Sequence, residues 1–181
     1  MSRDAVQLGY FDATDRLYPG QIADFATSRD NSTRGFPAET ELVAGRGAVR
    51  GTDIIIDNDN PMNQPAPYTL KAPDGATVDA DFIGIVIRTE SCTNSGDDEA
   101  AYAANTMATA TYKRGDGHVI GAKTSVAVAA GDPVYMSIDV AQAPNLPVGE
   151  FTNAAGAGVI EITGIKWHAQ AAAGTVGRIE L

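Results

Sequence analysis

Side chains that bind metal ions or transfer protons occur in a few short clusters of this chain. The first, Asp57-Asn58-Asp59-Asn60, offers the oxygen ligands that calcium prefers. An EF-hand loop needs glycine at its sixth position and glutamate at its twelfth, whereas Pro61 and Met62 follow here. The segment is therefore interpreted as a solvated acidic loop, with a weak irregular cation site as the alternative.

Two further acidic clusters invite comparison with the paired carboxylates of glycosidases. Asp79 and Asp81 flank Ala80 at the predicted start of a strand, and Asp97-Asp98-Glu99 ends a polar segment. The required separation of about 5–10 Å arises only in three dimensions, so sequence leaves this hypothesis open. A solvated loop, or for residues 97–99 the acidic start of a short helix, is the simpler interpretation.

The two histidines and the single cysteine lack catalytic neighbours. His118 and His168 are 50 residues apart and belong to no H-E-x-x-H or H-x-x-x-H arrangement, so zinc would need distant carboxylates. No G-x-S-x-G motif is present, and Cys92 has no base beside it. Each histidine is expected to be a partly exposed strand residue and Cys92 a small packed thiol. The sequence thus predicts no enzyme, no metal and no cofactor.

The glycines of residues 45–51 miss the dinucleotide-binding spacing by one residue and lie inside a predicted strand, so they form no phosphate loop. Arg46 and Arg50 share a face of that strand by their even spacing, and point to solvent or to an acidic patch of a partner. Trp167, the only tryptophan, is interpreted as a core anchor, with an interface hot spot as the alternative.

Composition narrows the class of protein further. The 181 residues suit one domain, and 19 glycines, 9 prolines and few aromatic residues favour short strands over long helices. The net charge of −10 and the absence of basic runs argue against nucleic acid as a partner. No run of about 18 apolar residues predicts a membrane span, one cysteine forbids an intrachain disulfide, and residues 1–5 do not resemble a signal peptide. Synthesis and assembly are therefore expected in a cytoplasm.

The elements that position these residues are predominantly short strands. Residues 1–18 show no period and are predicted to form an extended arm, or alternatively a frayed terminus. Residues 28–35 are expected to form a loop or an edge, 57–79 an irregular insertion, 89–99 a polar loop, and 100–104 one helical turn. The glycines of residues 113–117 predict a turn. Strands are predicted at residues 42–50, 52–56, 82–88, 106–112, 118–120, 126–129, 134–138, 151–152, 159–162, 164–170 and 178–181.

Strands at intervals of about 8–12 residues with turn signals between them are typical of a sandwich or a barrel. No amphipathic helical segment of 10–15 residues interrupts them, which argues against a parallel α/β sheet. The predicted fold is therefore all-β, an antiparallel β-sandwich or jelly-roll-like barrel spanning residues 19–181, with an extended N-terminal arm at residues 1–18.

Several short segments appear in an order that resembles a known family, the structural cement proteins of tailed phages. No one segment is specific, but their common order and spacing cover residues 19–181. The arm and residues 57–79 depart from the pattern. The matching segments are residues 19–24, 45–51, 84–86, 126–135, 149–151, 165–167, 171–174 and 179–181.

The resemblance implies a capsid decoration (cement) protein that binds the outer capsid surface, bridges neighbouring major capsid proteins and stabilises the shell. The implied partners are the major capsid protein and further copies of the chain, as a dimer or trimer, with no nucleic acid and no membrane. The implied location is the virion. A carbohydrate-binding β module of a phage surface or fibre protein is the alternative, and a hydrolase with converging carboxylates is a weaker one.

Apolar side chains in segments too irregular to form a core are the candidate partner contacts. Some lie in the predicted arm and the others in the loop of residues 61–68. The candidates are Tyr10, Phe11, Tyr18, Pro61, Met62, Pro65, Pro67 and Tyr68.

Overall fold

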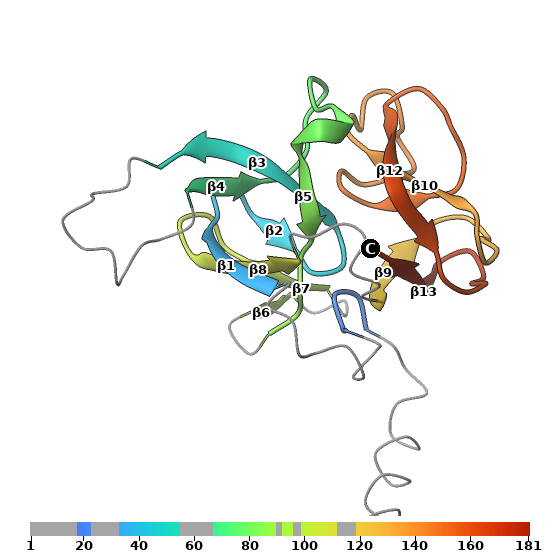
Figure 1. The fold of residues 1–181 in the computed structure, drawn as a ribbon, viewed down its shortest axis with the longest axis horizontal. Helices are drawn as coiled ribbons and strands as arrows, with labels where there is room; N and C mark the ends of the chain where they lie inside the picture. Colours follow the sequence, from blue (N-terminus) through green and yellow to red (C-terminus); the bar gives the residue numbers. More distant parts are fainter. Residues whose placement is uncertain (1–17, 23–32, 55–66, 90–91, 96–98, 112–118) are drawn as a thin grey trace, which may run out of the picture.

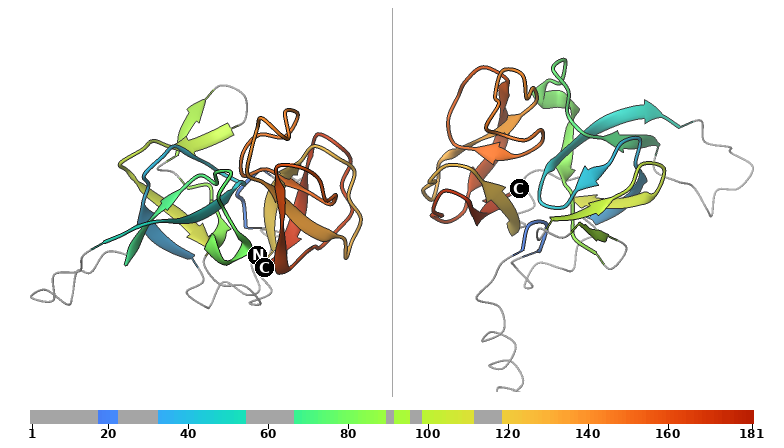
Figure 2. Two further views of the ribbon diagram at one scale, coloured as in Figure 1. Left: turned by 90° about the horizontal axis from the view of Figure 1, so that it is seen from above. Right: turned by 180° about the vertical axis from the view of Figure 1, so that it is seen from behind.

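The computed structural model describes residues 18–22, 33–54, 67–89, 92–95, 99–111 and 119–181. Within these residues the chain forms strands β1–β13 and one 3-10 turn, η2 (Asp79–Asp81), and no helix in this part is long and apolar enough to cross a membrane. The all-β, mainly antiparallel prediction is confirmed. Figures 1 and 2 show two groups of strands side by side, one from residues 33–111 and one from residues 119–181.

The strands of the second half form a closed five-stranded barrel in the order β10-β11-β9-β13-β12. All neighbours in it are antiparallel except β11 and β9, which are parallel. A closed barrel leaves no unpaired sheet edge. Its strands are β9 (Val119–Thr124), β10 (Pro133–Ser137), β11 (Phe151–Thr152), β12 (Val159–Trp167) and β13 (Thr175–Glu180).

Five strands within residues 33–111 form a second, less regular ring. Sheet β4-β3-β5 and sheet β1-β8 are joined by two isolated bridges, Ala38 with Leu70 and Val86 with Ala110. Ala38, at the end of β1, bridges to β4, and Val86, at the end of β5, bridges to β8. The strands are β1 (Thr33–Pro37), β3 (Gly47–Asp53), β4 (Tyr68–Lys71), β5 (Phe82–Ile85) and β8 (Met107–Thr111).

A small third sheet covers one end of this ring, in the order β2-β7-β6. It consists of β2 (Leu42–Val43), β6 (Thr93–Ser95) and β7 (Glu99–Tyr102). The predicted helical turn at residues 100–104 is therefore wrong, because Ala100 and Ala101 pair with β6 and are buried. The small side chains of Ala100 and Ala101 suggested a helix, but sheet pairing decides the conformation. The predicted polar loop at 89–99 likewise contains β6.

The barrel and the ring share one hydrophobic cluster. Val49, Phe82 and Ile85 of the ring pack with the barrel residues, and the rings of Phe82 and Phe151 meet edge to face at 6.4 Å between centroids. Gly47 lies at this contact, since a Cβ there would come within 2.2 Å of the Met136 sulfur. The two groups of strands therefore pack on each other through apolar side chains, and a second hydrophobic cluster, with Phe36, Leu70 and Tyr102, lies within the ring side.

Two glycines explain why some predicted strand boundaries were wrong. The predicted strand 42–50 is two strands, because the chain turns at residues 44–46, where Gly45 has φ of +79°. Conversely, the predicted strands 159–162 and 164–170 are the single strand β12. Gly164, with φ of +83°, lies where the buried alternation shifts from Ile162 to Ile165, as in a β-bulge. The predicted strand 126–129 is reduced to one bridge at Val128.

Other predictions hold or fall outside the described residues. Strands predicted at 106–112, 134–138, 151–152 and 178–181 correspond to β8, β10, β11 and β13, the last beginning earlier, at Thr175. The expected loop or edge at 28–35 runs into β1. The N-terminal arm before Tyr18, residues 57–66 of the predicted insertion and the turn at 113–117 lie outside the described residues, whereas the rest of the predicted irregular insertion contains strand β4.

Candidate functional site

The carboxylates considered for catalysis make structural hydrogen bonds. Asp79 accepts hydrogen bonds from the backbone N–H and the hydroxyl of Thr163 in β12, at 3.2 and 2.5 Å. Asp81 accepts one from the N–H of Val78 at 3.0 Å. Within the part of the chain that the structure describes, no three His, Cys, Asp or Glu side chains group as metal ligands. The residues 57–60 and 97–98 lie outside that part.

Glu99 connects three elements through two cations. Its Oε1 atom lies 2.9 Å from Nη2 of Arg46 and 3.6 Å from Nζ of Lys123 in β9. The prediction that Arg46 and Arg50 share one strand face is wrong, because Arg46 lies in the turn before β3. Arg50 lies in the strand and pairs with Asp53 at 2.6 Å in an exposed position. The Glu99 pairs thus join the ring side of the molecule to the barrel.

The remaining sequence candidates are structural as well. Trp167 is 1% exposed, which supports the core interpretation over the interface hot spot. Cys92 is half-buried, and its sulfur accepts a hydrogen bond from the N–H of Thr89 at 3.5 Å. His168 is an exposed residue after β12 with Nδ1 3.2 Å from Oε2 of Glu180. His118 lies outside the described residues.

The segment Tyr18–Ile22, called here the seam segment, contacts both groups of strands. The N–H of Gly20 donates to the Gly121 carbonyl of β9 at 2.7 Å, and Gly121 donates back to Gln21 at 2.8 Å. The Gly20 carbonyl accepts from the N–H of Arg88, which follows β5, at 3.0 Å. The seam segment is therefore hydrogen-bonded like an extra strand between the barrel and the ring.

Tyr18, one of the predicted contact residues, is the first described residue of the chain. It is 37% exposed, and the guanidinium carbon of Arg88 lies 4.9 Å from its ring centroid, a cation–π geometry. Its side chain is thus accessible and held on one side. The structure does not describe Tyr10 and Phe11, whose predicted role stays a prediction.

Pro67 and Tyr68 are the other described members of the predicted set. Pro67 is exposed, but Tyr68 belongs to β4, where its ring stacks on Phe36 at 5.4 Å and lies under Arg50 at 4.9 Å. The argument that an irregular segment frees this side chain for a partner does not apply to Tyr68, because strand pairing and packing hold it. Pro61, Met62 and Pro65 lie outside the described residues, so their predicted contacts stay predictions.

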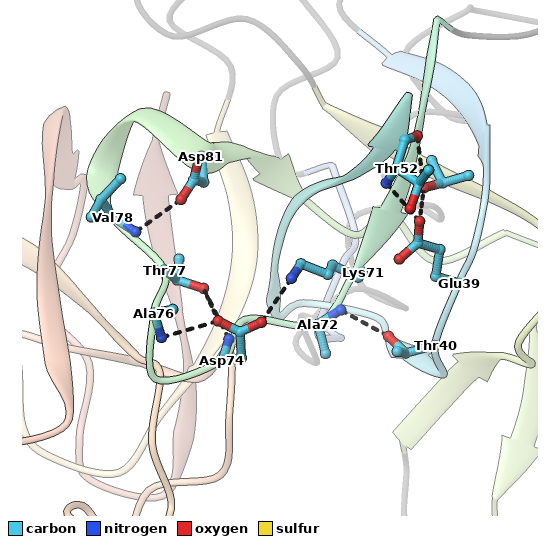
Figure 3. A network of polar contacts seen from close by, with 11 residues as sticks. Glu39, Thr40, Thr52, Lys71, Ala72, Asp74, Ala76, Thr77, Val78 and Asp81 are labelled. Atoms are coloured by element: carbon cyan, nitrogen blue, oxygen red, sulfur yellow. Dashed lines mark hydrogen bonds and ion pairs between the residues drawn. The ribbon is translucent and has the colours of Figure 1, made fainter. Parts of the chain in front are cut away.

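A polar network fixes the segment between β4 and β5 (Figure 3). Lys71 pairs with Asp74 at 2.7 Å, and Asp74 also accepts from the N–H of Ala76 at 3.1 Å. The side-chain bond with Lys71 and the backbone bond lower the pKa of Asp74. The N–H of Ala72 donates to the hydroxyl of Thr40 at 2.8 Å. These bonds give residues 72–78 a defined conformation on the surface.

Glu39 is the most strongly perturbed carboxyl group of the described residues. The N–H of Thr52 and the hydroxyl of Thr69 donate to its Oε1 at 2.6 and 2.5 Å (Figure 3). Hydrogen bonds from Thr52, followed by the one from Thr69, lower the pKa of Glu39 from 4.5 to about 2. Because these bonds favour the ionised form, they stabilise the fold where the carboxylate is charged.

This shift predicts a pH dependence of stability. The folded pKa of Glu39 is below its unfolded value, so its contribution is complete above pH 4.5 and is lost as the pH falls towards 2. Glu39→Gln should lower the melting temperature at pH 7 by about 2 °C, a small effect because the site is near the surface. The difference from the parent protein should shrink between pH 4.5 and 2 in thermal scans. Glu41→Gln, at an exposed carboxyl two residues away, is the control; an equal and pH-independent loss in both variants would contradict the assignment.

The fold has a counterpart among solved virus structures. A chain in the structure described as "The capsid of Myoviridae Phage XM1" superposes with a TM-score of 0.60, covering 91% of this chain and 89% of that chain at 16% identity. At this identity the likeness concerns the fold. No curated protein matches the chain.

The family follows from the sequence match. A family model described as structural cement protein (E217 gp24/Pam3 gp6) matches residues 6–181. The chain belongs to this phage structural cement protein family. It is accordingly a non-enzymatic structural component of the virion capsid, as the resemblance implied. The match begins at residue 6, so it includes most of residues 1–18, the predicted arm, which the resemblance did not cover.

Proposed function

We propose that this cement protein binds the outer surface of the assembled capsid, bridges neighbouring major capsid proteins and stabilises the shell. A protein that binds the assembled shell better than free subunits makes the shell harder to open by mass action. Many bound copies add to this effect, since each bridged subunit is held near its neighbour at high effective concentration.

The observation that carries the bridging proposal is the fixed position of the seam segment. Gly20 is buried and bonded on both sides, to Gly121 of the barrel and to Arg88 after β5. The residues before Tyr18 therefore start from a rigid point of the domain. We infer that residues 1–17, with Tyr10 and Phe11, extend from this point to a second capsid subunit while the body of the domain rests on the first.

The charge of the chain favours the outer surface over the genome-facing one. A net charge of −10 repels packaged nucleic acid, whereas the outer surface imposes no such cost. The protein is expected to act there as a symmetric dimer or trimer. Sedimentation of the free protein, compared with its copy number per shell, distinguishes the two.

Deletion of residues 2–17 tests the bridging role. The variant should fold, because the seam segment remains, but its saturating occupancy on undecorated capsids should fall at least tenfold in co-sedimentation. It should also lose the rise in capsid disruption temperature that the full chain confers. A second, narrower variant replaces Tyr10 and Phe11 by Ala in the full-length chain. If these two side chains make the contact, it should produce most of the same loss. Unchanged occupancy and unchanged capsid stability after the deletion would contradict the proposal.

A further inference from the structure

Charged residues are absent from one long exposed part of this acidic protein. They make up 20% of the whole chain, yet Glu150 is the only one between Val140 and Ile160. Glu150 is 3% exposed and accepts a hydrogen bond from the hydroxyl of Ser125, so it adds no charge to the surface. The gap in charge is therefore a property of the molecular surface and not only of the sequence.

The uncharged residues come together in two adjacent loops, 140–149 and 153–158, named here the neutral loop surface. Gly158 joins them, because its carbonyl accepts hydrogen bonds from the N–H groups of Ile138 and Asp139 at 2.8 and 3.2 Å. A Cβ at Gly158 would lie 2.9 Å from that of Gln142, so the loops are in direct contact. The exposed residues of this surface are Val140, Ala141, Gln142, Pro144, Asn145, Pro147, Ala154, Ala155, Gly156 and Ala157.

Buried contacts and hydrogen bonds fix the backbone of the neutral loop surface. Leu146 is buried, and its carbonyl accepts a hydrogen bond from the Ser137 hydroxyl at 3.0 Å. The carboxylate of Asp139 accepts from the N–H of Ala141 at 2.8 Å, and its carbonyl accepts from Ala143 at 2.9 Å. A surface with a fixed backbone and short side chains loses little conformational entropy when a partner covers it.

The border of this surface is acidic. The Asp139 carboxylate begins the first loop, and a Cβ on Gly75 would lie 3.8 Å from its Oδ2 atom, which brings the 73–78 segment with the Asp74–Lys71 ion pair beside it. Two of the exposed large apolar side chains, Val78 at 56% and Val140 at 47%, lie in these neighbouring segments. A charge-poor centre with a charged rim is the usual composition of a protein interface.

We propose that the neutral loop surface docks on an uncharged patch of a major capsid subunit whose border is basic or neutral, an inference that rests on the proposed function. A second copy of this chain fits less well. In a symmetric contact the same surface meets itself, so Asp139 of one copy would lie close to that of the other, between two chains of net charge −10.

The position of this surface suits a bridge between subunits. The neutral loops and η2 lie at the top of Figure 1, whereas the seam segment, in blue, lies at the lower side, and the reversed view of Figure 2 agrees. The seam segment, from which residues 1–17 start, thus lies on the opposite side of the described part of the molecule from the neutral loop surface. Under this proposal, the neutral loop surface and residues 1–17 contact different capsid subunits.

Charge insertion tests this surface. Ala141→Glu/Ala155→Glu and Ala141→Lys/Ala155→Lys place two charges of either sign at exposed positions without filling the core. Both variants should bind undecorated capsids at least tenfold more weakly in co-sedimentation, because either sign must be stripped of water in an uncharged contact. Ala172→Glu/Ala173→Glu, at exposed alanines of the loop between β12 and β13, is the matched control and should bind like the parent protein. Melting temperatures establish that all variants are folded.

The outcomes separate this inference from the function it rests on. If the parent protein binds no capsid, the proposed function fails. If the parent binds and both charged variants bind equally well, the proposed function stands and the neutral loop surface is not the contact. If the variant with one sign of charge binds capsids more weakly and the other binds more tightly, the patch on the capsid is charged, which contradicts the proposal. Loss of a parent dimer or trimer with unchanged capsid binding would assign the surface to a second copy.

Discussion

Gly20→Ala should lower the free energy of unfolding by about 3 kcal/mol or more, which is large for a single methyl group. Gly20 has φ of +77°, and its Cβ would come within 2.7 Å of the Val86 carbonyl oxygen, 2.8 Å of the Arg88 nitrogen and 2.9 Å of the Ala44 Cβ. The first two are backbone atoms, so no side-chain rotation can relieve the overlap. The seam segment would leave its position, and its hydrogen bonds to Arg88 and Gly121 would break.

Gly131→Ala is the matched control for this experiment. Gly131 also has a positive φ, +85°, but nothing lies within 4 Å of its Cβ position. Its substitution costs only the left-handed backbone strain of about 1–2 kcal/mol. In denaturant titrations, the loss of unfolding free energy should therefore be larger for Gly20→Ala than for Gly131→Ala, and the difference gives the cost of the steric overlap. Equal losses would mean that the seam segment is not enclosed as described.

Trp167→Ala should lower the free energy of unfolding by about 3–5 kcal/mol. Trp167 is 1% exposed in the barrel, its ring lies against Gly177, and its Nε1 donates to the Thr152 carbonyl at 3.4 Å. Removing the ring leaves a cavity that the closed strands around it are unable to fill by small shifts.

The measurement of this loss needs a probe other than fluorescence, because Trp167 is the only tryptophan. Circular dichroism during denaturant unfolding serves the parent and the variant equally. Trp167→Phe, which keeps much of the ring volume, should lose less than half as much stability. An alanine variant within 1 kcal/mol of the parent would contradict the assignment of Trp167 to the core.

Much of the fold is accessible from sequence because the barrel strands carry strong local signals. The segments that became β10 and β11 contain β-branched or aromatic residues next to clear turns. β7 was missed because its sequence Glu-Ala-Ala-Tyr has no strand preference, and only pairing with β2 and β6 makes it extended. The turn at Gly45 and the continuity of β12 through Gly164 depend on backbone angles that the sequence pattern does not determine.

The candidate site was less predictable than the fold. The seam segment was noticed only through its resemblance to the family, since its role depends on contacts with Arg88 and Gly121, far away in the chain. Tyr68 was assigned to an irregular loop but is held in a strand by Phe36. The neutral loop surface had a signal in the sequence, the charge gap from Val140 to Ile160, but only the structure joins its two loops into one face.

The pairing of the seam segment with β9 also sets an order of events during synthesis. Gly20 leaves the ribosome early, yet its partner Gly121 is made roughly 100 residues later. The ring strands between them can pair first, while the seam segment waits for the barrel. The seam segment therefore gains its barrel partner only after β9 has been translated, so the connection that it makes between the barrel and the ring forms late in synthesis.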